Sequence, residues 1–112
     1  MIRTIQLTDA KAIRDISEFS LGYKTTEAVT ERQIAKLLKD RQHFIRVYED
    51  DETHTVVGFI HAEAYELLYK EPGFNILGLA VSSEHQHKGI GKQLSIHLRK
   101  IAFTVSVAYM VC

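Results

Sequence analysis

The sequence predicts an α/β (α+β) protein whose 112 residues form a single domain, and three observations support this. Apolar residues alternate with polar ones, or form short continuous runs, in four segments, which is typical of strands. Two amphipathic helical patterns lie between the first and second of these segments, and such helices need a flat apolar surface to cover. A third helical pattern follows the last strand after a polar turn. We find no internal repeat, no low-complexity segment and no domain boundary.

Composition disfavours several classes of function. Apolar residues make up 46% and charged residues 25% of the chain, which are ordinary values for a globular protein. The 14 basic residues balance the 14 acidic ones, so neither nucleic acid nor an anionic membrane is expected as the main partner. No apolar run approaches the roughly 18 residues of a membrane span, and the N-terminus lacks the apolar segment of a signal peptide. Cys112 is the single cysteine, so no disulfide within the chain is expected, and a cytoplasmic location is the simplest setting.

The N-terminal third of the chain predicts a short strand followed by two helices. Side chains alternate from Ile2 to Leu7, and Thr8 or Asp9 offers an N-cap for the first helix. A Leu-Gly-Tyr sequence then breaks the helical pattern, and Thr25 or Thr26 offers a cap for the second helix. The apolar positions at helical spacing are Ile13, Ile16 and Phe19 in the first helix and Ile34, Leu37 and Leu38 in the second.

The middle of the chain predicts three strands joined by turns. Phe44 to Tyr48 forms the first strand of a hairpin, Glu49 to Glu52 forms an acidic, solvated turn, and Thr55 to Tyr65 forms the second strand. Glu71-Pro72-Gly73 is the plainest turn signal in the chain, and it leads into a third strand from Asn75 to Val81.

The stretch from Asn75 to Lys92 carries the candidate site. Its strand is followed by a polar turn from Ser82 to His87 and by a helix from Lys88 onward. A helix N-terminus leaves backbone N–H groups without partners and adds partial positive charge, so it can hold a phosphate through the main chain alone. Gly89 and Gly91 let the backbone turn tightly and approach a ligand, where a Cβ would obstruct it.

Two common glycine motifs do not fit this stretch. A Walker A loop needs Gly-x-x-x-x-Gly-Lys-Ser/Thr, but Gln86 stands at the first glycine and Gln93 at the serine or threonine. A dinucleotide fingerprint needs Gly-x-Gly-x-x-Gly, but Leu94 stands at its third glycine. What remains is Gln-His-Lys-Gly-Ile-Gly at 86–91, directly after an apolar strand, which matches the pattern Gln/Arg-x-x-Gly-x-Gly/Ala.

With the strand before it and the amphipathic helix after it, this pattern resembles the acetyl-coenzyme A signature of the GNAT N-acetyltransferase superfamily, and the resemblance runs from Ile2 to about Ala102. It implies a mixed, mostly antiparallel sheet with helices on both faces. The family's last strands and fourth helix are absent, so the chain resembles a C-terminally shortened member. The terminal segment from Phe103 to Cys112 is atypical, being apolar and rich in β-branched residues, and it predicts a strand beside Asn75 to Val81. Our hypothesis is that a second copy buries this apolar edge in a homodimer.

The resemblance also implies a function. Members transfer an acetyl group from acetyl-coenzyme A, their co-substrate, to a primary amine by direct attack, without a metal. In the family the cofactor lies where the strand ending at Val81 splays from its neighbour. That strand's main chain then holds the pantetheine arm, and the amides from His87 to Lys92 hold the pyrophosphate. The residues expected to bind the cofactor are Leu79, Ala80, Val81, Gln86, His87, Lys88, Gly89, Ile90, Gly91 and Lys92. The acceptor, a small molecule or a protein amine, is not defined by the sequence.

Catalytic residues stay unassigned because the sequence departs from the family pattern. Some relatives carry a glutamate base where this chain has Asn75, which cannot accept the proton. Glu63 and His61 share one face of the preceding strand by alternation, and either could substitute or be a surface residue. Many members also supply a tyrosine as general acid from a helix beyond the next strand, and this chain ends at Cys112 without it.

Three interpretations are open at this point. The chain is an active N-acetyltransferase, or a non-catalytic remnant that binds coenzyme A or only dimerises, or an interaction module without cofactor, which the intact signature disfavours. Lys88 and Lys92 either contact phosphates or are solvated lysines. His85 and His87 lack a third ligand at fixed spacing, so no metal site is expected.

Overall fold

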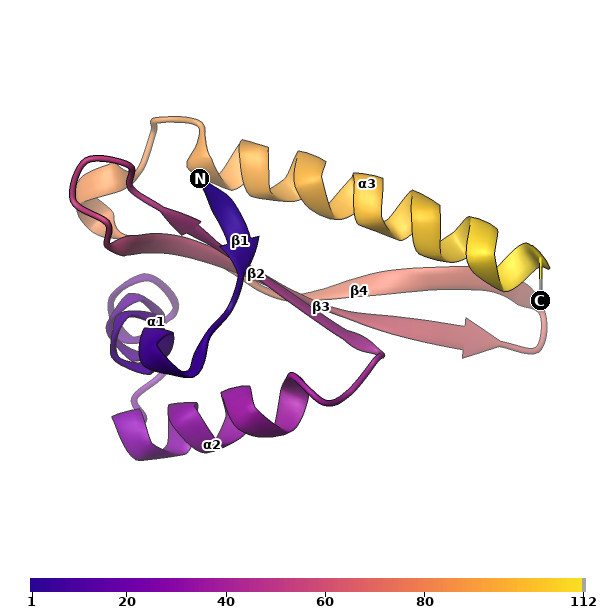
Figure 1. Cartoon of the computed structure of the whole chain (residues 1–112), viewed down its shortest axis with the longest axis horizontal. Helices are drawn as coiled ribbons and strands as arrows, with labels where there is room; N and C mark the ends of the chain where they lie inside the picture. The colour runs from indigo at the N-terminus through magenta and orange to yellow at the C-terminus, as the bar shows by residue number, and fades with distance from the viewer. Residues whose placement is uncertain (112) are drawn as a thin grey trace.

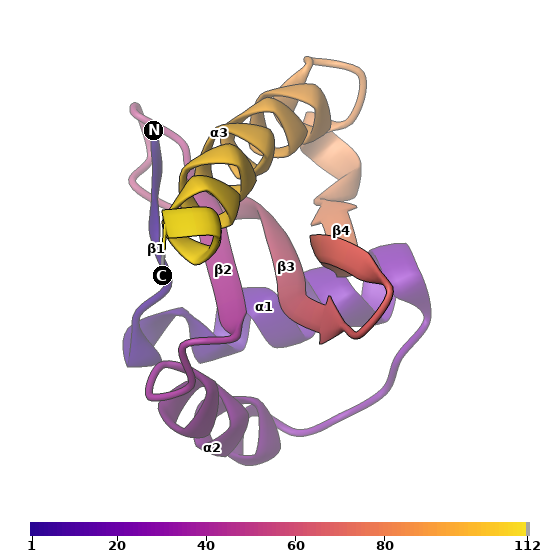
Figure 2. The ribbon, with the colours of Figure 1, turned by 90° about the vertical axis from the view of Figure 1, so that its right-hand side faces the viewer.

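The structure is a computed structural model that describes the backbone of residues 1–111 and the side chains of residues 1–69 and 73–101. One four-stranded sheet has the order β1-β2-β3-β4, and each strand pairs antiparallel with its neighbour. Two helices, α1 and α2, cover one face of this sheet and α3 covers the other (Figures 1 and 2). The predicted α/β class, with helices on both faces of an antiparallel sheet, is confirmed. The elements are β1 (Ile2–Thr4), η1 (Leu7–Asp9), α1 (Ala10–Ile16), η2 (Ser17–Leu21), α2 (Glu27–Leu37), β2 (His43–Glu49), β3 (Val56–Leu67), β4 (Lys70–Val81), η3 (Ser83–His85) and α3 (Ile90–Val111).

The hydrophobic core has two parts because side chains alternate across the sheet. Phe59 and Ile60, adjacent in β3, belong to different parts. The part beneath α1 and α2 comprises Ile5, Ala10, Ile13, Ile16, Ile34, Ile45, Val47, Phe59 and Ala80. The part beneath α3 comprises Val57, Ile60, Ala62, Ile90, Leu94 and Leu98. Both faces of β3 are therefore buried, and this burial fixes the register in which β3 pairs with β4.

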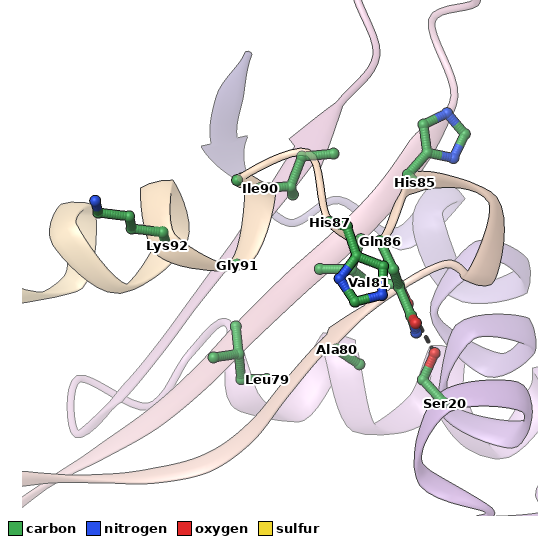
Figure 3. Close-up of a pocket in the computed structure, with 11 residues that line it drawn as sticks. Ser20, Leu79, Ala80, Val81, His85, Gln86, His87, Ile90, Gly91 and Lys92 are labelled. Atoms are coloured by element: carbon green, nitrogen blue, oxygen red, sulfur yellow. Dashed lines mark hydrogen bonds between the residues drawn. The ribbon is translucent and has the colours of Figure 1, made fainter.

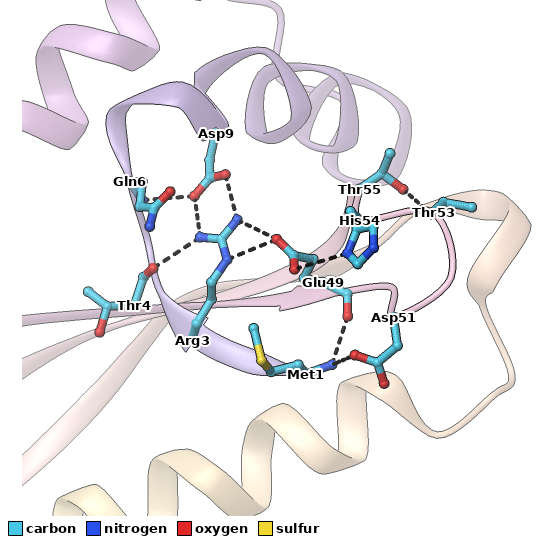
Figure 4. Close-up of polar contacts among 10 residues, drawn as sticks. All are labelled: Met1, Arg3, Thr4, Gln6, Asp9, Glu49, Asp51, Thr53, His54 and Thr55. Carbon is cyan, nitrogen blue, oxygen red and sulfur yellow. Dashed lines mark hydrogen bonds and ion pairs between the residues drawn. The ribbon is translucent and has the colours of Figure 1, made fainter.

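The first strand ends at Thr4, earlier than predicted, and a part-buried ion-pair cluster joins it to the residues that follow (Figure 4). The Arg3 guanidinium donates to both carboxylate oxygens of Asp9, at 2.8 and 2.9 Å, and to Glu49 at 3.1 Å. Asp9 is only 5% exposed, and it also accepts from the Gln6 N–H rather than capping α1. Burial alone would raise the pKa of Asp9, but the hydrogen bonds from Arg3 and Gln6 outweigh it and lower that pKa.

The two helices on the first face begin and end near the predicted residues, with one difference. Thr26 caps α2 by accepting from the Val29 N–H, and Gly22 ends the preceding helical segment with a φ of 74°. Phe19 was expected on the buried stripe, yet it is 81% exposed. The reason is that η2 is a π-helix, whose wider turn rotates this residue away from the sheet.

The predicted turn at Glu71–Gly73 is wrong, because the chain reverses earlier. Leu67 pairs with Lys70, so Leu68 and Tyr69 form the turn, and β4 begins at Lys70. Pro72 lies inside β4 at an irregularity of the register. A proline without an N–H is tolerated at such a position on an edge strand.

The prediction of a C-terminal strand from Phe103 is also wrong. The backbone stays helical to Val111, as the last part of the 22-residue α3. No glycine or proline interrupts the sequence after Gly91, so the helix continues and β-branched residues do not end it. The homodimer expected through an apolar edge strand at this end therefore loses its structural basis, and the side chains concerned lie outside those described.

Candidate cofactor site

A pocket of about 420 Å³ lies where β4 ends and α3 begins (Figure 3). Four parts of the chain contribute to it: the last residues of β4, the loop before α3, the first turn of α3 and the helical segment η2. The lining residues are Ser20, Leu79, Ala80, Val81, His85, Gln86, His87, Gly89, Ile90, Gly91 and Lys92. Nine of the ten residues predicted to bind the cofactor are among them, and only Lys88 is not.

The loop at residues 86–89 directs the N-terminus of α3 into this pocket. Gln86 is extended, and both His87 and Gly89 have positive φ, 66° and 81°. Ile90, the first residue of α3, is buried against Gly58, where a Cβ would meet the Ile90 Cγ2 and the Ala80 carbonyl oxygen at 3.2 Å. The absence of a side chain at Gly58 thus lets α3 begin close to the sheet, with the unpaired N–H groups of its first turn beside the pocket.

The two glycines of the signature have different roles. Gly89 needs its left-handed conformation, while a Cβ there would meet nothing within 4 Å. Gly91 has no positive φ, and a Cβ there would touch only the Val81 Cγ2, at 3.9 Å. Gly89 is therefore required by the backbone, whereas Gly91 keeps the pocket wall free of a side chain.

The main chain at the end of β4 presents polar groups to the pocket. The Ser82 N–H donates to the Val57 carbonyl, so alternation turns the N–H and C=O of Leu79 and Val81 away from β3. In the described part of the chain, no strand lies on that side of β4. The expected splayed pair of strands is thus absent, and the outward groups come from an open edge instead. The main-chain groups of Ala80, which was also predicted to hold the pantetheine arm, instead turn toward β3 by the same alternation.

Ser20 is a pocket residue that the sequence did not predict. Its hydroxyl donates to the Val81 carbonyl oxygen at 2.8 Å, and Gln86 donates to the same oxygen at 3.3 Å (Figure 3). Ser20 and Val81 are 61 positions apart, so no local pattern could have placed Ser20 at the site. This bond ties η2 to β4, and π-helical segments are frequent at functional sites.

His85 is held as part of the pocket wall. Its Nδ1 is 2.8 Å from the Ser82 hydroxyl, and its Nε2 is 3.5 Å from an Asp50 carboxylate oxygen.

Within residues 1–69 and 73–101, no three histidine, cysteine or acidic side chains come together to hold a metal ion. A search of the described residues also finds no helix long and apolar enough to cross a membrane.

His61 and Glu63 lie on one face of β3, as alternation predicted, and both contact His43 of β2. The His61 Nε2 is 2.9 Å from the His43 Nδ1, and the His43 Nε2 is 3.6 Å from a Glu63 oxygen. Burial lowers the pKa of His61, and the nearby His43 lowers it further, while Glu63 acts in the opposite direction. Glu63 pairs in register with Asn75. No sequence pattern predicted a role for His43, because its contact depends on the pairing of β2 with β3.

An antiparallel sheet whose edge strand leads into a signature loop and a helix N-terminus defines an acyltransferase fold. The chain belongs to the acetyltransferase (GNAT) family, whose sequence model matches residues 10–112. No curated protein matches the chain.

Solved structures of this family share the fold. A GNAT family acetyltransferase of Staphylococcus aureus superposes with a TM-score of 0.82 at 18% identity, over 95% of this chain and 79% of that one. Glucosamine-6-phosphate N-acetyltransferase of Arabidopsis thaliana gives 0.81 at 14% identity, over 95% and 76%. An aminoglycoside 6'-N-acetyltransferase of Acinetobacter haemolyticus gives 0.78 at 16% identity, over 95% and 73%. At these identities the likeness establishes the fold and leaves the acceptor open.

Proposed function

We propose that residues 1–112 form one catalytic domain that transfers the acetyl group of acetyl-coenzyme A to a primary amine. The observation that carries this proposal is the pocket at the end of β4, which combines the first turn of α3 with the outward main-chain groups of Leu79 and the outward N–H of Val81, whose carbonyl is bonded to Ser20 and Gln86. The first can hold a pyrophosphate, and the second can pair with the amide groups of a pantetheine arm.

The residues present fit this cofactor. Gly89 and Gly91 place no side chain in the pocket, and Lys92 places a cation at the pocket wall. When bound, acetyl-coenzyme A supplies the activated thioester, and the chain binds and orients it. An outward N–H at Leu79 is suited to stabilise the oxyanion that develops on the carbonyl, a contribution of about 2.7–4 kcal/mol for one such donor. A reducing, cytoplasmic compartment would suit the free thiol of the product.

Calorimetric titration with acetyl-coenzyme A tests the cofactor site. The Gly91→Trp variant fills the pocket, while Gln93→Trp adds the same side chain to an exposed position of α3 outside the pocket. We expect saturable binding by the wild type and by Gln93→Trp, and its loss in Gly91→Trp. Equal binding by all three proteins, or none by the folded wild type, would contradict the proposal.

Turnover is tested by thiol release with four amines: butylamine, spermidine, kanamycin and a lysine-containing peptide. Thiol release with any of them establishes transfer to an amine. Binding without release from all four would favour the alternative of a non-catalytic domain that binds coenzyme A.

A further inference from the structure

The contact between His43 and His61 has a defined direction. The carboxylates of Glu63 and Asp40 lie 3.6 and 3.9 Å from the His43 Nε2, and carboxylates only accept hydrogen bonds. They therefore favour the tautomer of His43 that carries its proton on Nε2. The Nδ1 of His43 must then accept from the His61 Nε2 at 2.9 Å. In this arrangement the His61 Nδ1 carries a lone pair and can accept a proton.

His61 also lines a cavity that has room for water. The cavity measures about 180 Å³ and lies between β3 and the two helices α1 and α2. Its wall is mostly apolar, and the side chains of Ser17, Thr30 and Gln33 add polar groups beside His61. A site of this size with several polar partners can hold an ordered water.

The position of His61 in the sheet brings it near β4, the strand whose last residues line the proposed cofactor pocket. It pairs in register with Gly78, one residue before Leu79. Neighbouring strands lie about 4.8 Å apart. Gly78, opposite His61, adds no side chain of its own to this part of the sheet, and the nearest side chain to a Cβ there would be Phe59, at 3.5 Å.

We propose that His61 is the proton acceptor for the amine, acting through a water, and that His43 is the positioning residue that fixes its tautomer. This inference rests on the proposed function. The ammonium group gives one proton to the His61 Nδ1 through the water, and the nitrogen then forms a bond to the thioester carbon. The carbon–sulfur bond breaks, the thiolate takes the second nitrogen proton, and His61 releases its proton to solvent.

The surroundings keep His61 neutral at pH 7, the form that this role needs. Burial lowers its pKa below the ordinary value, and His43 lowers it further. Glu63 is the charged group that opposes them, and Asp40 lies behind His43. The polar residues that α1 and α2 place in the cavity wall, Ser17, Thr30 and Gln33, are neutral.

The test measures kcat/KM against pH, with an amine from the four that gives thiol release. For the wild type we expect kcat/KM to fall on the acid side of the profile, and this acid limb should lie below the ordinary titration range of histidine. His61→Gln should lose this limb and about 10²- to 10⁴-fold in rate, without weaker acetyl-coenzyme A binding. In His43→Gln the limb should move to higher pH, because the influence of His43 that lowers the pKa of His61 is gone. His61→Ala should regain rate when imidazole is added.

Nitrogen-15 spectra of the histidine rings supply a second readout without any amine. We expect the neutral His61 at pH 7 to carry its proton on Nε2. The opposite tautomer, or an unchanged pH profile in His61→Gln, would overturn the proposal. So would the absence of thiol release from all four amines by a protein that binds acetyl-coenzyme A. Failure of the cofactor site itself is distinguishable, because it appears in the titration with Gly91→Trp, which involves neither histidine.

Discussion

The signature glycines allow stability and ligand binding to be separated. In Gly89→Ala the new Cβ has space, but the residue must keep a φ of 81°, which costs an L-residue about 1–2 kcal/mol. In Gly91→Ala the backbone is ordinary and the Cβ makes one contact of 3.9 Å, while alanine favours the helix by up to about 0.8 kcal/mol. We therefore expect Gly89→Ala to lower the free energy of unfolding and Gly91→Ala to leave it unchanged or raise it.

Ligand binding should also distinguish the two variants. The pattern Gln/Arg-x-x-Gly-x-Gly/Ala allows alanine at position 91 but not at position 89. Gly91→Ala should therefore bind acetyl-coenzyme A like the wild type, whereas Gly89→Ala, which adds a methyl group to a pocket-lining residue, should bind it at least about tenfold more weakly, which corresponds to 1.4 kcal/mol. Urea unfolding measures the stabilities, and calorimetry measures the affinities. Each change of 1 kcal/mol in the free energy of unfolding also shifts the melting temperature by about 4–8 °C in a domain near this size.

Gly22→Ala is the matched control. Its φ is 74°, its Cβ would also meet nothing within 4 Å, and it does not line the pocket. It should lose stability as Gly89→Ala does, while binding acetyl-coenzyme A like the wild type. The reasoning is refuted if Gly91→Ala is less stable than the wild type, or if Gly89→Ala binds the cofactor as tightly as the wild type does.

Three further predictions concern the supports of the site and the fold. Ser20→Ala removes the hydrogen bond to the Val81 carbonyl and should cost about 1 kcal/mol in urea unfolding, with faster amide exchange in η2. Thr26→Ala removes the cap of α2 and should lower the free energy of unfolding by about 1 kcal/mol, whereas Thr26→Ser should keep it. Because the pKa of Asp9 is lowered in the folded protein, its stabilising effect is present above the unfolded value of 3.8 and is lost as the pH falls through the folded value. Asp9→Asn should therefore be less stable at pH 7 and lose less stability on acidification to pH 3. An identical pH dependence in the two proteins would contradict this assignment.

The sequence predicts the order of elements because that order depends on local signals. The cap at Thr26 and the break at Gly22 both appear where they are expected. The two wrong predictions of secondary structure have different causes. Pro72 indicated a turn, but an edge strand tolerates it at a register irregularity. The β-branched residues after Ala102 favoured a strand, but a helix that has already formed continues until a stop signal.

The candidate site likewise contains residues that local sequence predicted and residues that only the folded chain brings together. Most of its residues are contiguous in the sequence, from Leu79 to Lys92, and the pattern was sufficient to predict them. Ser20 and His43 come from segments 61 and 18 residues from their partners, so only the folded chain brings them into place. The open edge of β4 also depends on the sheet order rather than on any residue type.

The register of β3 against β4 shows where a carboxylate lies relative to Asn75, the position at which some relatives carry a glutamate base. A register irregularity after His61 places Glu63 opposite Asn75, so a negative charge stays in the same row of the sheet, one strand away. There it lies 3.6 Å from His43, whose other ring nitrogen is 2.9 Å from His61. In the mechanism we propose, the carboxylate acts on the proton of an imidazole rather than on the amine directly. Because both histidines sit on paired strands, this arrangement is fixed by the same hydrogen-bond ladder that positions Leu79 and Val81 at the pocket.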